Sequence, residues 1–104
     1  MIQEEIRNLL EAPPSGDDAP SLDYIEHTLT AGYATALALE AERWRLERKI
    51  AELAQSLTDE SSDLRHSELA ETAQRLSESE GDLTKLRALL SSLRTRADQV
   101  RLAS

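Results

Sequence analysis

The sequence contains no cysteine and no phenylalanine, and its aromatic side chains are limited to one tryptophan and two tyrosines. Without cysteine the chain has no disulfide, no thiolate nucleophile and no thiolate-bound metal. With so few aromatic rings it lacks the large groups that usually fill a globular core. The three glycines and three prolines lie mostly in one N-terminal stretch, so the remainder can run as uninterrupted helix. We therefore expect an all-α protein.

Long hydrophobic runs and an excess of basic residues are also missing. No stretch approaches the roughly 18 apolar residues of a membrane span, and the first residues lack the basic and apolar regions of a secretory signal. The net charge is −8, which argues against nucleic acid and against an anionic membrane surface as partners, because both require a basic surface. We expect a cytoplasmic protein, although export by a route without a signal peptide stays open.

A seam of mainly apolar residues recurs at steps of three and four and predicts one long helix over residues 22–57. A second heptad pattern predicts a helix over 63–103, and the polar residues 58–62 predict the turn between them. Two long helices with so short a connection should fold as an antiparallel coiled-coil hairpin, pairing residue numbers that sum to about 122. The seam of the first helix is Leu22, Ile25, Leu29, Gly32, Ala36, Leu39, Arg43, Leu46, Ile50, Leu53 and Leu57.

The first 21 residues have a different pattern. Residues 1–12 predict a short amphipathic helix, which would be marginal on its own, and residues 13–21 form a linker rich in proline, glycine and aspartate. Ser21 is a candidate N-cap for the helix that follows, with Asp23 in its first turn. The short helix is either a frayed terminus or a tethered peptide-type anchor that binds through Ile2, Ile6, Leu9 and Leu10.

The helix over 22–57 carries a second stripe, which includes Tyr33, Leu37 and Trp44 and lies roughly 100° from the seam. One partner helix cannot cover both faces. The stripe should therefore pack on a second copy, giving a helical bundle, on a different protein, or on the N-terminal helix. Trp and Arg are frequent interface anchors, so the predicted partner-binding residues are Tyr33, Leu37, Trp44, Arg45 and Arg48.

Polar residues interrupt the seam in the half of the hairpin nearest the turn. The register places Arg43 opposite Ser79 and Ile50 opposite Thr72, so we expect this half to be the softer one. Arg43 and Ser79 form a predicted polar core layer. Arg43 is either a buried cation that binds an anion or, as we favour, a side chain that sets the register or reaches solvent beside glutamates.

The spacing of residues in the predicted hairpin brings together no set of side chains suited to catalysis or metal binding. The only histidines, His27 and His66, should lie far apart in the hairpin, and Asp63-x-x-His66 occurs once where a di-metal site needs two such motifs. The chain has no nucleophile elbow and no phosphate-binding loop. We predict no enzyme activity, no metal and no cofactor.

These observations favour a non-enzymatic protein–protein interaction module, acting as an adaptor, a chaperone or an antagonist of a regulator. The expected partner is another protein or a second copy, with a homodimer favoured. The alternative is a regulator whose dimer interface binds an anionic small ligand, such as a nucleotide second messenger, through arginines.

Overall fold

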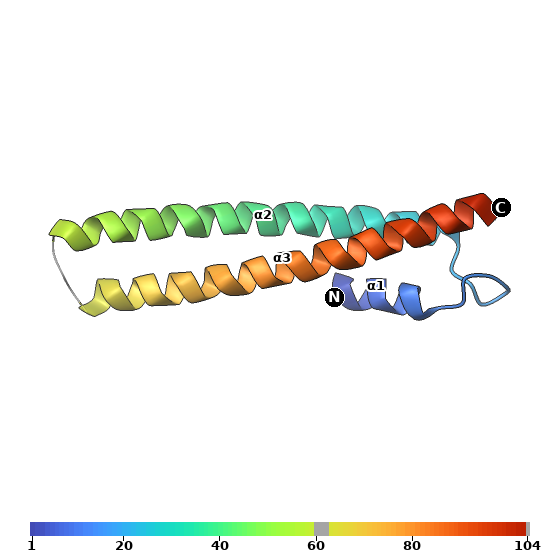
Figure 1. Cartoon of the computed structure of the whole chain (residues 1–104), viewed down its shortest axis with the longest axis horizontal. Coiled ribbons are helices and arrows are strands. Elements are labelled where there is room, and N and C mark those ends of the chain that lie inside the picture. Colours follow the sequence, from blue (N-terminus) through green and yellow to red (C-terminus); the bar gives the residue numbers. More distant parts are fainter. Residues whose placement is uncertain (60–62, 104) are drawn as a thin grey trace. The chain divides into compact units, whose positions relative to one another are not determined.

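The computed structural model describes residues 1–59 and 63–103, and this part of the chain is helical without strands. It contains α1 (Ile2–Glu11), α2 (Leu22–Asp59) and α3 (Asp63–Ala103), shown in Figure 1. The two long helices pack closely against each other as a hairpin, and a short helix precedes them. The predicted fold class is confirmed. Of the predicted turn at 58–62, α2 includes the first two residues, and residues 60–62 lie outside the described part.

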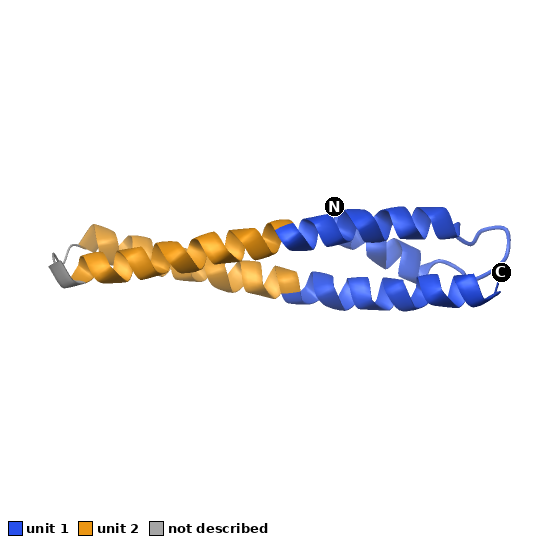
Figure 2. Ribbon diagram, turned by 90° about the horizontal axis from the view of Figure 1, so that it is seen from above, with its two compact units in different colours: residues 1–37, 84–104 blue, residues 38–83 orange. Residues whose placement is uncertain are grey.

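The chain divides into two compact units, coloured separately in Figure 2. Unit 1 comprises Met1–Leu37 and Thr84–Ser104, so it contains α1, the start of α2 and the end of α3. Unit 2 comprises Ala38–Leu83, with the remainder of α2 and the start of α3. Unit 1 therefore has three helical segments and unit 2 has two.

Ser21 begins α2 in the way the sequence predicts. The Tyr24 N–H donates a hydrogen bond to Ser21 Oγ at 3.1 Å, and the Ile25 N–H donates to the Ser21 carbonyl at 3.1 Å. The side chain thus satisfies one of the N–H groups that a helix start leaves without an intrahelical partner. Asp23 lies in the first turn, where its charge complements the helix dipole. The predicted N-cap is confirmed.

The linker between α1 and α2 turns at its one glycine. At the end of α1, Ala12 adopts extended backbone angles and donates its N–H to the Asn8 carbonyl at 3.1 Å, and the prolines that follow prevent further helix. Gly16 has φ of 98°, a region that side chains disfavour, and its carbonyl accepts the Ala19 N–H at 3.2 Å. The chain can thereby reverse between α1 and α2.

The core of unit 1 is mainly apolar and well buried, and its one buried polar residue among those described, Thr28, donates its hydroxyl to the Tyr24 carbonyl at 2.9 Å. At its centre Gly32 faces Leu90, because a Cβ atom added to Gly32 would contact the Leu90 side chain directly and would lie 3.5 Å from Ile6 Cδ1. This pair confirms the predicted register within unit 1, with a small residue opposite a large one. The buried apolar side chains of unit 1 are Ile6, Leu9, Ile25, Leu29, Ala36, Leu86, Leu90, Leu93 and Ala97.

The core of unit 2 is less buried and more polar. Among its described residues the fully buried apolar side chains are Leu46 and Leu83, and the buried polar ones are Thr72 and Ser79. The Thr72 hydroxyl donates to the Glu68 carbonyl at 2.7 Å, whereas Ser79 Oγ is buried with no hydrogen-bond partner. The remaining seam residues are only half-buried, namely Leu39, Ile50, Leu53, Leu57, Leu69 and Leu76.

Candidate protein-binding surface

Trp44 is the most prominent exposed apolar side chain on the α2 segment of unit 2. Its side chain is 63% exposed, and the guanidinium carbon of Arg48 lies 5.4 Å from the centre of its ring. That distance allows a cation–π interaction. Because Arg48 lies one helical turn after Trp44, the helix itself holds the cation against the ring. A rigid ring with an adjacent cation is the composition of a protein-interface anchor.

Ion pairs on the surface of unit 2 organise the basic side chains near Trp44. Arg45 Nη2 lies 3.2 Å from Glu42 Oε2, and Arg75 Nη2 from α3 lies 3.8 Å from Glu42 Oε1. Glu42 therefore links the two helices of this unit. The groups are substantially exposed, so each pair contributes at most about 1 kcal/mol. Their effect is mainly to fix where the side chains point.

The two helical segments of unit 2 carry different charge. Residues 38–59 contain four basic and five acidic side chains, and the basic ones are gathered as Arg43, Arg45, Arg48 and Lys49. Residues 63–83 contain six acidic and two basic side chains. A shallow cavity of about 420 Å³ on this α3 segment is lined by Ala70, Glu71, Gln74, Arg75 and Glu78. Its two carboxylates make it unsuited to an anion.

The predicted polar layer has one half-exposed and one buried member. The Arg43 side chain is 38% exposed and its Nε lies 3.8 Å from Glu47 Oε1, which matches a cation that reaches the surface along its own helix. Ser79 is buried, and its hydroxyl has no partner. A buried hydroxyl without a hydrogen bond destabilises the fold. The layer therefore weakens the core of unit 2.

Tyr33 and Leu37 belong to unit 1 and are also exposed, at 41% and 66%. The docked α1 leaves both accessible. Tyr33 lines a cavity of about 350 Å³ in unit 1, together with Glu26, Leu29, Thr30, Arg94, Ala97 and Arg101. The structure thus distributes the five predicted partner-binding residues between the units: Tyr33 and Leu37 in unit 1, and Trp44, Arg45 and Arg48 in unit 2.

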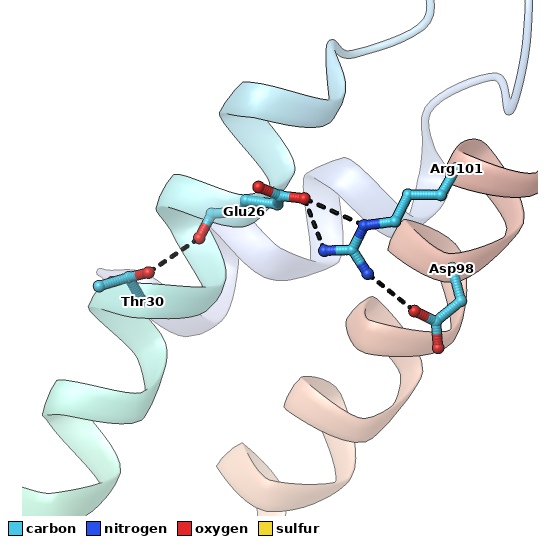
Figure 3. Close-up of polar contacts among 4 residues, drawn as sticks. All are labelled: Glu26, Thr30, Asp98 and Arg101. Atoms are coloured by element: carbon cyan, nitrogen blue, oxygen red, sulfur yellow. Dashed lines mark hydrogen bonds and ion pairs between the residues drawn. The ribbon is translucent and has the colours of Figure 1, made fainter. Parts of the chain in front are cut away.

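Arg101 is engaged by carboxylates at the rim of this cavity (Figure 3). Its Nη2 and Nε donate to Glu26 Oε1 at 2.6 and 3.2 Å, and its Nη1 donates to Asp98 Oδ1 at 3.0 Å. Hydrogen bonding to the Glu26 carboxylate, together with its charge, raises the pKa of Arg101 above its ordinary value. An anionic ligand in this cavity would have to compete with two carboxylates, so the geometry favours it less than Arg94 and Arg101 alone suggest.

The N-terminal helix is docked in unit 1. Of its four predicted anchor side chains, Ile6 and Leu9 are buried, and Ile2 and Leu10 are half-buried. Arg96 of α3 donates to the Leu10 carbonyl at 2.9 Å and to the Ala12 carbonyl at 3.2 Å. The heptad pattern of α3 does not single out Arg96 as a binding residue. The last turn of α1 has no basic residue of its own. This absence is the one sequence signal that a cation from elsewhere in the chain could bind its carbonyls.

Within residues 1–59 and 63–103, no group of three or more histidine, aspartate or glutamate side chains is arranged to hold a metal ion. None of the helices, as far as the structure describes them, combines the length and apolar character that crossing a membrane requires.

Comparison with known proteins gave no match: no family model, no curated protein and no solved structure resembles this chain significantly.

Proposed function

We propose that this chain is a non-enzymatic protein–protein interaction module that self-associates through unit 2. The observation that carries the proposal is the exposure of Trp44, 63%, on a two-helix unit whose own core buries few apolar side chains. A second surface packed on this face of α2 would cover the ring. Removing such apolar area from water is the main driving force of association.

A second copy is the occupant that the charge pattern supports. The α2 segment of unit 2 presents a basic cluster beside Trp44, and the α3 segment carries an excess of carboxylates. In a two-fold dimer every contact between different residues occurs twice, so an α2 segment that packs on the α3 segment of the other copy does so at two places. Each such contact would bring the basic cluster of one copy near carboxylates of the other, which favours encounter and fixes the orientation.

The role that follows is an adaptor, a chaperone or an antagonist of a regulatory protein, acting in the cytoplasm by binding alone. A helical surface with one large aromatic anchor, flanking arginines and surrounding carboxylates suits such binding, because a few central side chains supply most of the energy of an interface.

Analytical ultracentrifugation of the wild type, Trp44→Ala and Tyr24→Ala tests the proposal. Tyr24 is a matched control, because it is an exposed aromatic residue of the same helix but belongs to unit 1. We expect the wild type to dimerise, and Trp44→Ala to raise the dimer dissociation constant by about 30-fold, which corresponds to about 2 kcal/mol. Tyr24→Ala should leave it nearly unchanged.

Circular dichroism confirms that each variant keeps its helical content, so that a loss of association is not a loss of fold. A wild type that stays monomeric at every concentration contradicts self-association and assigns the Trp44 surface to a different protein. Equal effects of the two alanine variants would show that unit 2 is not the interface.

A further inference from the structure

Helix α1 occupies a groove in unit 1 that is formed by α2 and α3. Its contacts show what kind of helix this groove can bind. Ile6 and Leu9 are fully buried there, and Ile6 lies against Gly32. Because Gly32 has no side chain, the Ile6 methyl group can approach the α2 backbone closely. The apolar part of this groove therefore fits a helix that presents apolar side chains at successive turns of one face.

The polar part of the groove recognises the C-terminus of the bound helix. The last turn of α1 has no basic side chain to complement its exposed carbonyls, and Arg96 supplies two donors, to the carbonyls of Leu10 and Ala12. A cation at a helix C-terminus is stabilising. Since these bonds go to backbone oxygens, Arg96 recognises any helix that ends at this position, whatever its side chains.

Helix α1 and the α3 segment of unit 1 carry opposite net charges. The segment of α3 in unit 1, residues 84–103, contains five basic side chains and one acidic one. Helix α1 is acidic, with Glu4, Glu5 and Glu11 against Arg7. The groove thus combines an apolar floor with a donor for helix carbonyls, and it accepts an acidic helix.

We infer that this groove is a binding site for an acidic amphipathic helix of another protein, and that α1 is its internal competitor. Helix α1 has ten residues and no side-chain N-cap, so it has little stability apart from its docking. Occupancy of the groove by α1 depends on the linker, because the linker keeps α1 at a high effective concentration beside the groove. The site lies within unit 1, so the inference does not depend on the self-association proposed for unit 2.

The test is binding of a fluorescent, amidated peptide of residues 1–13 to the full-length chain, measured by fluorescence anisotropy. Three proteins are compared: the wild type, a chain with thirty Gly/Ser residues inserted after Gly16, and Ile6→Asp. The insertion lies in the exposed linker between α1 and α2, so it alters no residue of the groove or of either helix. Lengthening the linker about fourfold lowers the effective concentration of α1, so the peptide should bind the extended chain about eightfold more tightly than the wild type.

Ile6→Asp places a charge where α1 is buried and should release it, so the peptide should bind this chain the most tightly of the three. In that background Arg96→Gln should weaken binding by about tenfold, because it removes two charge-assisted hydrogen bonds. A peptide of the same composition with its apolar residues scrambled is the control for non-specific binding.

Failure of the peptide to bind any of the chains overturns the inference, as does an affinity that is the same for the wild type and the extended chain. Sedimentation tests the other occupant. If the extended chain forms a larger oligomer than the wild type, counted in chains per particle, α1 exchanges between copies, and the groove belongs to a second copy instead of a different protein. The extended chain, in which no groove contact is altered, keeps the test valid if Ile6→Asp fails to fold.

Discussion

The two units of this chain use the same two helices but differ in what completes them. In unit 1 the short helix α1 adds a third layer, and Ile6, Leu86 and Leu93 are completely buried. In unit 2 no third segment of the described chain is present, and most of the seam leucines remain half-exposed. Two helices bury one stripe each, and a further helix is needed to enclose a core.

The comparison indicates where binding capacity resides. Unit 1 meets its own requirement for a third helix with α1, the segment that we infer to be exchangeable. Unit 2 leaves Trp44 and its neighbours uncovered, and it tolerates Thr72 and Ser79 in its core. Low burial and exposed apolar side chains mark regions that pack on partners.

The largest predicted effect is on the free energy of unfolding, and it compares the two cores by the same leucine-to-alanine substitution in each unit. Leu86→Ala in unit 1 should lower the free energy of unfolding by about 2–5 kcal/mol, because it leaves a cavity in a closed core. Leu76→Ala in unit 2 should cost about 1 kcal/mol, because Leu76 is half-exposed and its site can fill with water. Urea unfolding at a concentration where the chain is monomeric measures both. Equal costs would mean that the units are equally well packed.

The next effect has the opposite sign. Ser79→Ala should raise the free energy of unfolding by about 1 kcal/mol or more, since it removes a buried hydroxyl that has no partner. Ser77→Ala is the matched control, because Ser77 is exposed on the same helix and reports only the helix propensity of alanine. If the two variants are stabilised equally, the hydroxyl of Ser79 is not a weakness of unit 2.

Much of the fold was predictable because it depends on local spacing. The steps of three and four predicted both long helices, the short connection predicted their antiparallel packing, and Gly32 opposite Leu90 confirms the register in unit 1. The polar seam positions Arg43, Thr72 and Ser79 predicted a weaker half near the turn, and the lower burial of unit 2 agrees with that expectation.

The docking of α1 was not predictable from spacing. It depends on Arg96, which lies more than eighty residues from the carbonyls that it binds, and no local pattern connects such distant positions. The sequence left three possible partners for the second stripe of α2. The structure shows that α1 instead packs through Ile6 against Gly32 of α2. Tyr33 and Leu37 therefore stay exposed. The partner-binding role of the stripe stays a prediction.

A smaller effect concerns the start of α2 in unit 1. Ser21→Ala should lower the free energy of unfolding by about 1 kcal/mol, because the Tyr24 N–H loses its side-chain acceptor. Ser15→Ala, in the exposed linker, is the control and should change it little. Thermal unfolding followed by circular dichroism gives both values. A loss no greater than that of the control would show that the cap does not contribute.

The smallest effect concerns the exposed ion pairs of unit 2. Glu42→Gln removes the carboxylate shared by Arg45 and Arg75 and should lower the free energy of unfolding by less than about 0.5 kcal/mol. The difference from the wild type should shrink further in high salt. A loss above about 2 kcal/mol, insensitive to salt, would show that polar links and not apolar packing hold this unit together.

The central claim, that unit 2 is completed by a second copy, is tested most directly by the fluorescence of Trp44, the only tryptophan in the chain. Its emission is recorded as the protein is diluted through the concentration range in which sedimentation detects association. We predict emission typical of a buried indole at high concentration and a shift to longer wavelength on dilution, following the loss of dimer. Emission typical of an exposed indole at every concentration, whatever the mass of the particle, would contradict the claim.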